Sequence, residues 1–180
     1  MKYIKLFENF VPHDPYELMI IPPNKQAEMI MRECEKDEPN LNLVSDLIVL
    51  GANLDWQHEE NYNWTPLHVA AGYGRVEIAK MLIDAGADLN VQDNSEQTPL
   101  HWAARFGEVE VVRMLIGAKA DLNMQDNSEQ TPLHRAADNG RVEIARMLID
   151  AGARKDIHNN KGRLPYDLAK TEEMKNLLRQ

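Results

Sequence analysis

The ten residues QDNSEQTPLH occur at 92–101 and recur without a change at 125–134. The shorter segment TPLH also appears at 65–68, so these segments recur every 33 residues. A second segment keeps the same period, because RVEIAKMLIDAGA at 75–87 becomes RVEIARMLIDAGA at 141–153. A fixed period of this length predicts a solenoid of stacked units, in which each unit buries its apolar face against its neighbours.

Each copy has the pattern of two short helices. Thr98 is a good N-cap residue, and Pro99 suits the first helical position, where no amide donor is needed. The helix that follows, LHWAARF, is expected to stop at Gly107. A second segment, VEVVRMLI, has apolar residues at helical spacing, and Gly86 and Gly152 stand where a left-handed C-terminal cap is expected. The connecting segment DLNMQDNSEQ is rich in Asp, Asn and Ser, which predicts turns.

These features together resemble the ankyrin repeat. The shared features are TPLH-x-A-A, a Gly six residues after the His, a V-E-[IV] helix and then GADLN, at the 33-residue period. The resemblance covers roughly residues 25–180. It implies an all-α repeat solenoid of helix-turn-helix units whose connecting segments project as β-hairpin fingers. In such a fold the fingers and the first helices form a concave groove that binds partner proteins.

The resemblance divides the chain into an N-terminal extension, residues 1–23, and an ankyrin repeat domain, residues 24–180. We expect five units: a degenerate first unit at 24–59, full units at 60–92, 93–125 and 126–158, and a terminal unit at 159–180. The terminal unit has Leu164 and Asp167 in place of the capping Thr and the His. Its last segment, TEEMKNLLRQ, has apolar residues on one side and charges on the other, as a cap exposed to water needs.

The N-terminal extension contains four prolines, which forbid a long helix there. One interpretation is a tail that packs over the first unit. The other is a docking peptide whose apolar side consists of Tyr3, Ile4, Leu6, Phe7 and Phe10.

Charge and composition exclude several classes of function. The 180 residues carry a formal net charge of −9, whereas binding to nucleic acid or to an anionic membrane requires a basic face. Cys34 is the single cysteine, which excludes an intramolecular disulfide and fits a reducing compartment. No apolar run approaches the roughly 18 residues of a membrane span. We therefore expect a cytoplasmic protein, monomeric on its own, whose partner is neither nucleic acid nor a membrane.

No set of residues indicates an enzyme. His68, His101 and His134 recur with the period, but neighbouring units stack roughly 10 Å apart, whereas zinc needs ligands about 2 Å away. The resemblance implies that each of these histidines bonds its own Thr and the neighbouring backbone. Cys34 has no base at useful spacing and is expected to fill the core. We expect no catalytic residue, no metal and no cofactor.

Specificity in a repeat array is expected where the copies differ. The fingers and first helices of two adjacent units hold five of the chain's eleven aromatic residues: Tyr62, Trp64, Tyr73, Trp102 and Phe106. Aromatic residues and arginine are enriched at binding hot spots, and an exposed aromatic patch marks an interaction site. Toward the fourth unit the predicted surface becomes a hydrogen-bonding rim: Arg105, Arg135, Asp138 and Asn139. The sequence thus predicts a protein-binding groove with an apolar anchor and a polar rim.

Alternatives stay open at this point. Trp102 occupies a position that often packs between first helices, and Trp64 precedes the N-cap residue, so either ring could be structural. Within the binding class, the chain could be an inhibitor that occludes the active or recruiting surface of another protein, helped by its acidic charge. Outside that class, it could be a structural spacer with no dedicated ligand.

Four residues replace the glycine that the repeat normally has. Asn63, Glu96 and Glu129 stand two residues before the capping Thr of their fingers, and Lys119 replaces the glycine that caps a second helix. If these positions need positive φ, Glu costs about 1 kcal/mol, while Asn is tolerated. We predict that Lys119→Gly raises the melting temperature.

Overall fold

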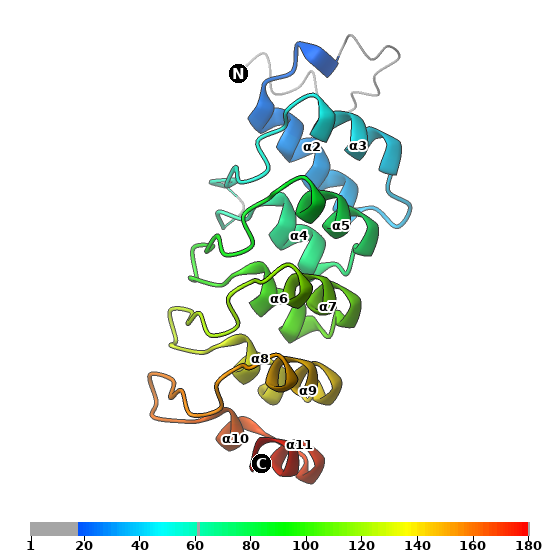
Figure 1. Ribbon diagram of the computed structural model, residues 1–180. Coiled ribbons are helices and arrows are strands. Elements are labelled where there is room, and N and C mark those ends of the chain that lie inside the picture. Colours follow the sequence, from blue (N-terminus) through cyan, green and yellow to red (C-terminus); the bar gives the residue numbers. More distant parts are fainter. Residues whose placement is uncertain (1–17, 61, 180) are drawn as a thin grey trace.

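The structure, a computed structural model, describes residues 18–60 and 62–179. Its helices stack in successive pairs along one elongated array (Figure 1). The pairs are α2 (Pro23–Glu35) with α3 (Leu41–Val49), α4 (Pro66–Gly72) with α5 (Val76–Asp84), α6 (Pro99–Phe106) with α7 (Val109–Gly117), α8 (Pro132–Asp138) with α9 (Val142–Asp150), and α10 (Pro165–Leu168) with α11 (Glu172–Arg179). The prediction of an all-α ankyrin-type solenoid is confirmed.

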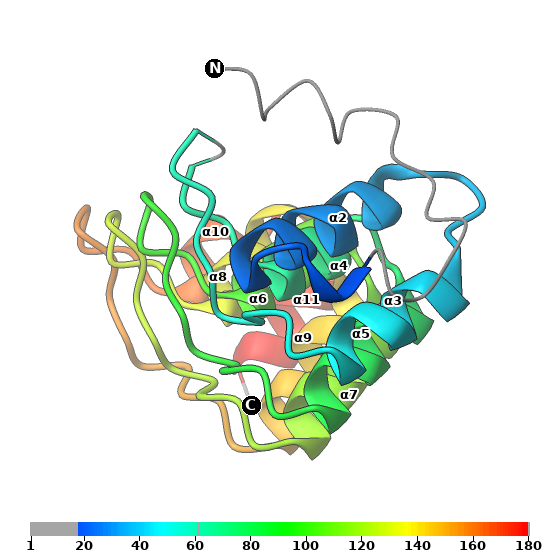
Figure 2. The same cartoon turned by 90° about the horizontal axis from the view of Figure 1, so that it is seen from above.

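The helices form two layers. The first helices α2, α4, α6, α8 and α10 contact one another in sequence, and the second helices α3, α5, α7, α9 and α11 do the same. The fingers project to one side, next to the first helices (Figures 1 and 2). The core lies between the layers and consists of fully buried residues from both: Leu67, Leu100 and Leu133 from the first helices, and Ile78, Leu82, Leu115, Ile144 and Leu148 from the second. Each such side chain stabilises the fold by about 1.5–3 kcal/mol through burial.

The TPLH segment caps the first helix and joins it to the next unit. The backbone N–H of Thr98 donates to Nδ1 of His101 over 3.1 Å. Because Nδ1 accepts this bond, Nε2 carries the proton and donates to the Gln130 carbonyl of the next unit over 3.0 Å. Both ring nitrogens are therefore engaged, as the resemblance implied. Burial lowers the pKa of His101 to about 4 and also lowers the pKa values of His68 and His134, so all three rings are neutral at pH 7.

The predicted fingers are present as hairpin turns. In the unit 93–125, the Asp93 N–H donates to the Gln97 carbonyl over 2.9 Å. Pairing ends there, so the described fingers contain one isolated bridge, between His58 and Trp64, and no regular strand. Adjacent fingertips are joined by backbone hydrogen bonds, for example from the Asn94 N–H to the Tyr62 carbonyl over 2.9 Å.

A ladder of glutamines joins the same fingers at their bases. The side-chain amide of Gln57 donates to the Gln92 carbonyl, that of Gln92 to the Gln125 carbonyl, and that of Gln125 to the His158 carbonyl. Contacts at tip and base hold the fingers as one row, so the surface they present is organised before any partner arrives.

The expected positive φ angles are confirmed. Asn63, Glu96 and Glu129 have φ of 56°, 58° and 56°, and Lys119 has 70°. Sequence reasoning missed one more, Tyr62 with φ 55°. A bulky residue in the left-handed region is strained, and such strain is often found at functional sites.

The end units cover the core on both sides. Leu18 and Ile21 are buried in the core at the N-terminal end of the array. At the other end, Met174 and Leu178 are the buried residues of α11, which caps the array. Cys34 fills the core of the first unit, where burial raises the pKa of its thiol to about 12. Residues 1–17 lie outside the described part of the chain, so both interpretations of the N-terminal extension and the boundary at residue 23 stay predictions.

Candidate protein-binding surface

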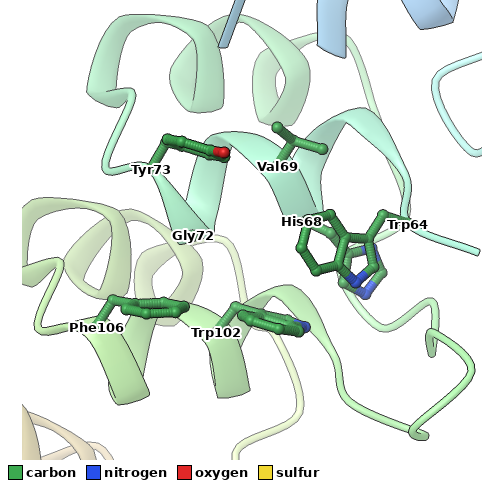
Figure 3. Close-up of a pocket in the computed structure, with 7 residues that line it drawn as sticks. All are labelled: Trp64, His68, Val69, Gly72, Tyr73, Trp102 and Phe106. Atoms are coloured by element: carbon green, nitrogen blue, oxygen red, sulfur yellow. The ribbon is translucent and has the colours of Figure 1, made fainter. Parts of the chain in front are cut away.

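A hollow of about 280 Å³ opens between the first helices of the second and third units (Figure 3). We call it the aromatic slot; its lining residues are Trp64, His68, Val69, Gly72, Tyr73, Trp102 and Phe106. Val69 and Tyr73 come from the α4 side, and Trp102 and Phe106 from α6 (Figure 3). The stacking of the repeat therefore brings together residues 29 or more positions apart in the sequence.

The ring faces define the shape of the aromatic slot. The rings of Trp102 and Phe106 are nearly parallel, with an interplanar angle of 16° and centroids 5.6 Å apart. Trp64 meets Trp102 edge-on at 4.8 Å, and Tyr73 lies across the hollow from Phe106 (Figure 3). Offset and edge-to-face arrangements of this kind stabilise aromatic clusters.

A buried carboxylate orients both tryptophans. Oδ2 of Asp93 accepts hydrogen bonds from the indole N–H groups of Trp64 and Trp102, at 3.1 and 2.9 Å. Its Oδ1 accepts the backbone N–H groups of Ser95 and Gln97 at 2.7 and 3.0 Å. The carboxylate thus ties the finger of one unit to the neighbouring unit and to α6. Both indoles are half-buried, so each ring serves the fold with its N–H and still lines the aromatic slot.

The other three predicted aromatics are exposed. Tyr62, Tyr73 and Phe106 retain 66%, 51% and 44% of their accessible surface, which leaves large apolar faces in water. The Tyr62 ring centroid lies 6.0 Å from that of Trp64, on the finger beside the aromatic slot. The five aromatics therefore form one continuous surface, of the kind that marks interaction sites.

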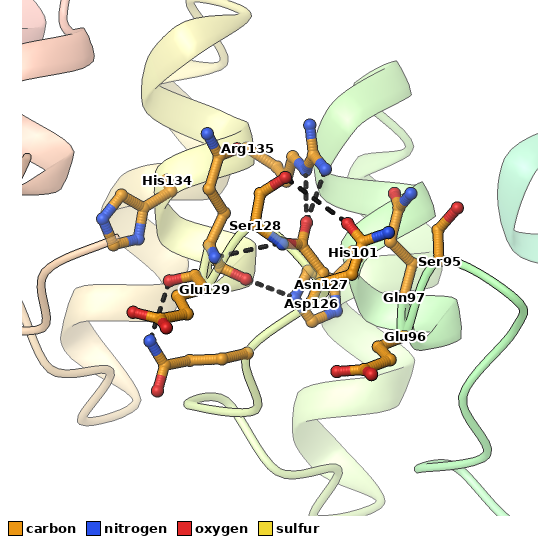
Figure 4. A network of polar contacts seen from close by, with 12 residues as sticks. Ser95, Glu96, Gln97, His101, Asp126, Asn127, Ser128, Glu129, His134 and Arg135 are labelled. Carbon is orange, nitrogen blue, oxygen red and sulfur yellow. Dashed lines mark hydrogen bonds and ion pairs between the residues drawn. The ribbon is translucent and has the colours of Figure 1, made fainter. Parts of the chain in front are cut away.

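The predicted polar rim is largely occupied by contacts within the protein. Arg135 donates through Nε to the fully buried Asp126 at 3.0 Å and forms an ion pair with it (Figure 4). Asp138 pairs with Lys170 at 3.1 Å, and the Asn139 amide donates to the Arg135 carbonyl. Arg135 therefore holds the fold instead of presenting a free guanidinium.

Arg105 is the rim residue that belongs with the aromatics. The carbon of its guanidinium lies 5.6 Å from the Trp102 ring centroid and 5.5 Å from that of Phe106. These distances are within reach of a cation–π interaction. A positive charge therefore already lies beside two walls of the aromatic slot.

Asp93 and Asp126 show how identical fingers come to differ. Each lies in the same segment DNSEQ, and each faces the residue nine positions later, Trp102 or Arg135. Indole N–H groups satisfy the first carboxylate and a guanidinium satisfies the second. Sequence reasoning missed both pairs, although the constant spacing of nine residues was the available signal.

A second hollow, of about 530 Å³, lies between α2 and the finger of the second unit, and sequence reasoning missed it. Its charged residues from α2 pair with one another, since Lys25 and Arg32 both contact Glu28. Burial alone would raise the pKa of Glu28, but the hydrogen bond from Lys25 and the nearby positive charges lower it overall. Glu28 thus offsets one of the two positive charges that this helix brings to the hollow.

His68 in the wall of the aromatic slot is neutral, and both of its ring nitrogens are hydrogen-bonded. Residues 18–60 and 62–179 contain no group of three or more side chains placed to hold a metal ion. None of the helices they form is long and apolar enough to span a membrane. What the aromatic slot can do chemically is bury an apolar group beside a positive charge.

The structure is that of a repeat protein, in which stacked helix pairs present a row of fingers and an aromatic-lined hollow. The chain belongs to the ankyrin-repeat family: the model of that family, described as ankyrin repeats in three copies, matches residues 30–126, 86–160 and 115–178. Ankyrin repeats generally serve as protein–protein interaction modules, and the family is typically non-enzymatic.

Two curated proteins share part of the array. The neurogenic locus notch homolog protein 2 of Homo sapiens and that of Mus musculus are each 39% identical to this chain over 54 residues. The match covers 30% of this chain and 2% of each notch protein. It is thus a similarity between repeats within much longer proteins.

Proposed function

We propose that this protein is a non-enzymatic interaction module that binds a partner protein through its concave groove and fingers, with the five aromatics as the anchor. The supporting observation is that Tyr62, Tyr73 and Phe106 remain exposed beside two half-buried tryptophans in one apolar hollow. Exposing apolar rings to water is unfavourable, so burying them under a partner would contribute favourable free energy to binding.

The architecture supports this role in two further ways. Hydrogen bonds join the fingers at tip and base, and hydrogen bonds to Asp93 orient the two tryptophans. Little side-chain freedom is therefore lost when a partner binds. A groove of this kind can supply roughly 800 Å² per partner, which is the size of a standard interface. Truncation of a well-buried anchor residue typically costs about 2 kcal/mol or more in affinity.

A comparative pull-down tests the proposal. The aromatic variant carries Tyr62→Ala, Tyr73→Ala and Phe106→Ala, and a control variant carries exposed substitutions on the second-helix layer: Lys80→Ala, Arg113→Ala and Arg146→Ala. Circular dichroism first checks that both variants are folded. We expect the wild type and the control variant to retain a protein from cells of the source organism that the aromatic variant loses.

The same experiment separates the alternatives. If all three baits retain the same proteins, the groove is not the binding site. If no protein is retained specifically by any bait, the structural spacer without a dedicated ligand is favoured. An inhibitor would retain one partner and suppress that partner's activity when the two are mixed.

A further inference from the structure

The aromatic slot exists where the repeat carries a glycine in place of a side chain. Gly72 occupies the position that Arg105 and Asp138 occupy in the next two units, 33 and 66 residues later. Arg105 extends beside the rings of its own unit, and Asp138 pairs with Lys170. In the second unit nothing extends from this position, so the space between α4 and α6 stays open (Figure 3).

The backbone and the packing do not require this glycine. Gly72 is the last residue of α4 and does not have positive φ. A Cβ added to it would meet Cε3 of Trp102 at 3.9 Å, an ordinary van der Waals contact. A glycine within a helix is destabilising relative to alanine. Gly72 therefore lowers the stability of α4 and leaves the aromatic slot open.

The walls of the aromatic slot indicate what enters it. Its volume of about 280 Å³ is below the range of about 300–1,000 Å³ that is typical of sites for drug-sized ligands. The hollow therefore has room for about one large side chain. The lining side chains are mainly aromatic and aliphatic, so an apolar group fits there best. The guanidinium of Arg105, beside the rings of Trp102 and Phe106, would in addition repel a second cation.

The fingers beside the aromatic slot carry the opposite charge. Residues 55–64 and 88–97, the fingers of the second and third units, contain six acidic residues and no lysine or arginine. Glu59, Glu60 and Glu96 among them are exposed. The finger of the terminal unit, residues 154–163, is in contrast basic, with four lysines and arginines against one aspartate. Residues 121–130, the finger of the fourth unit, likewise contain three acidic residues and no lysine or arginine. Negative charge therefore runs along the fingers of the second to fourth units, including the two beside the aromatics.

We propose that the aromatic slot receives one bulky apolar side chain, Trp, Phe or Leu, from a segment of the partner, and that the acidic fingers of the second and third units receive lysine or arginine residues of the same segment. Gly72 is then a specificity-determining residue, because it makes room for the anchor. This inference rests on the proposed function and adds the chemistry of the partner to it.

Filling the aromatic slot tests the role of Gly72. Gly72→Leu places a side chain in the hollow, whereas Gly117→Leu is a matched control, since Gly117 is also helical and an added Cβ there would meet no atom within 4 Å. We expect Gly72→Leu to keep the melting temperature of the wild type or raise it. We also expect it to bind the partner retained in the pull-down roughly tenfold more weakly or worse. The control is expected to bind like the wild type. Equal binding by both variants would overturn the proposal.

Blocked heptapeptides test the chemistry of the anchor and of its flanks. The set has a central Trp, Phe, Leu or Ala, flanked by lysines in one series and by glutamates in the other. Binding is followed on the indole N–H signals of Trp64 and Trp102 by NMR at low salt. We expect the lysine peptides with an apolar centre to shift both signals, with roughly tenfold weaker binding for the alanine centre or for glutamate flanks.

The outcomes separate this inference from the proposed function. Three results would each overturn the inference: equal shifts with lysine and glutamate flanks, equal shifts with alanine and aromatic centres, or no shift with any peptide up to about 10 mM. If the pull-down still loses its partner with the aromatic variant while Gly72→Leu retains it, the proposed function stands and the anchor in the aromatic slot is wrong. If the aromatic variant also retains the partner, both are wrong.

Discussion

Lys119→Gly should relieve strain at one backbone position without removing a buried contact. Lys119 is exposed and has φ 70° at the end of α7. Its N–H donates to the Ile116 carbonyl and the Ala120 N–H donates to the Leu115 carbonyl, both at 3.0 Å, which is the Schellman pattern of a helix C-terminus. The substitution keeps both hydrogen bonds and removes the Cβ that opposes the left-handed conformation.

The expected gain follows from two opposing effects. An L-residue in the left-handed region costs about 1–2 kcal/mol, and glycine removes this cost. Glycine also makes the unfolded chain more flexible, which reduces the gain in stability by about 0.4–1 kcal/mol. The net stabilisation is therefore about 1 kcal/mol or slightly less. For a domain of this size, 1 kcal/mol corresponds to a rise in melting temperature of about 2–4 °C.

The repeat supplies its own reverse control. Gly86 and Gly152 hold the equivalent position with φ of 87° and 96°, and an added Cβ would meet no atom within 4 Å at either. Gly86→Lys and Gly152→Lys should therefore each destabilise the protein by about the amount that Lys119→Gly stabilises it. Urea unfolding and thermal melts followed by circular dichroism measure all three. A lower melting temperature for Lys119→Gly, with the expected loss in the two reverse variants, would refute the reasoning for this turn.

Three further predictions concern buried charge, pH and strain. Arg135→Ala leaves the carboxylate of Asp126 buried without its cation, and it should lower the free energy of unfolding, measured in urea, by about 3 kcal/mol. Adding Asp126→Asn to this variant should recover part of the loss. Strictly additive effects of the two substitutions would contradict the coupling. The pKa of His101 falls from 6.5 to about 4 on folding, so between these pH values the unfolded chain binds more protons than the folded one. The contribution of this ring to the free energy of unfolding is therefore fully present above pH 6.5 and is lost as the pH falls toward 4. The loss approaches about 3 kcal/mol from this ring, and a melting temperature that does not change between pH 7 and 5, where most carboxylates stay ionised, would rule this out. Tyr62→Gly relieves the strain of a positive φ, so it should keep or raise the melting temperature. It also removes an exposed ring, so it should reduce partner capture in the pull-down. Unchanged capture would exclude Tyr62 from the site.

Much of the candidate site could be anticipated because repeat positions predict which residues share a face. Tyr62, Tyr73 and Phe106 were expected on the groove and lie exposed there. The polar rim was less predictable, because whether a charged side chain is free depends on what it meets in the next element. Arg135 faces a buried carboxylate and Asp138 faces Lys170, and neither pair follows from the pattern of the copies alone.

The sequence by itself determined three features. The 33-residue period determined the fold, the Thr-Pro pairs determined where the first helices begin, and the residues at glycine positions determined the strained turns. Each of these features depends on contacts within a unit or on a contact repeated in every unit. Tertiary structure decided the hollow at Gly72, the shared carboxylate of Asp93 and the pairing of Arg135. These features arise where two non-identical units meet. Local propensity carries no information about such a junction, since the free volume and the hydrogen-bond partner there are set by side chains distant in the sequence.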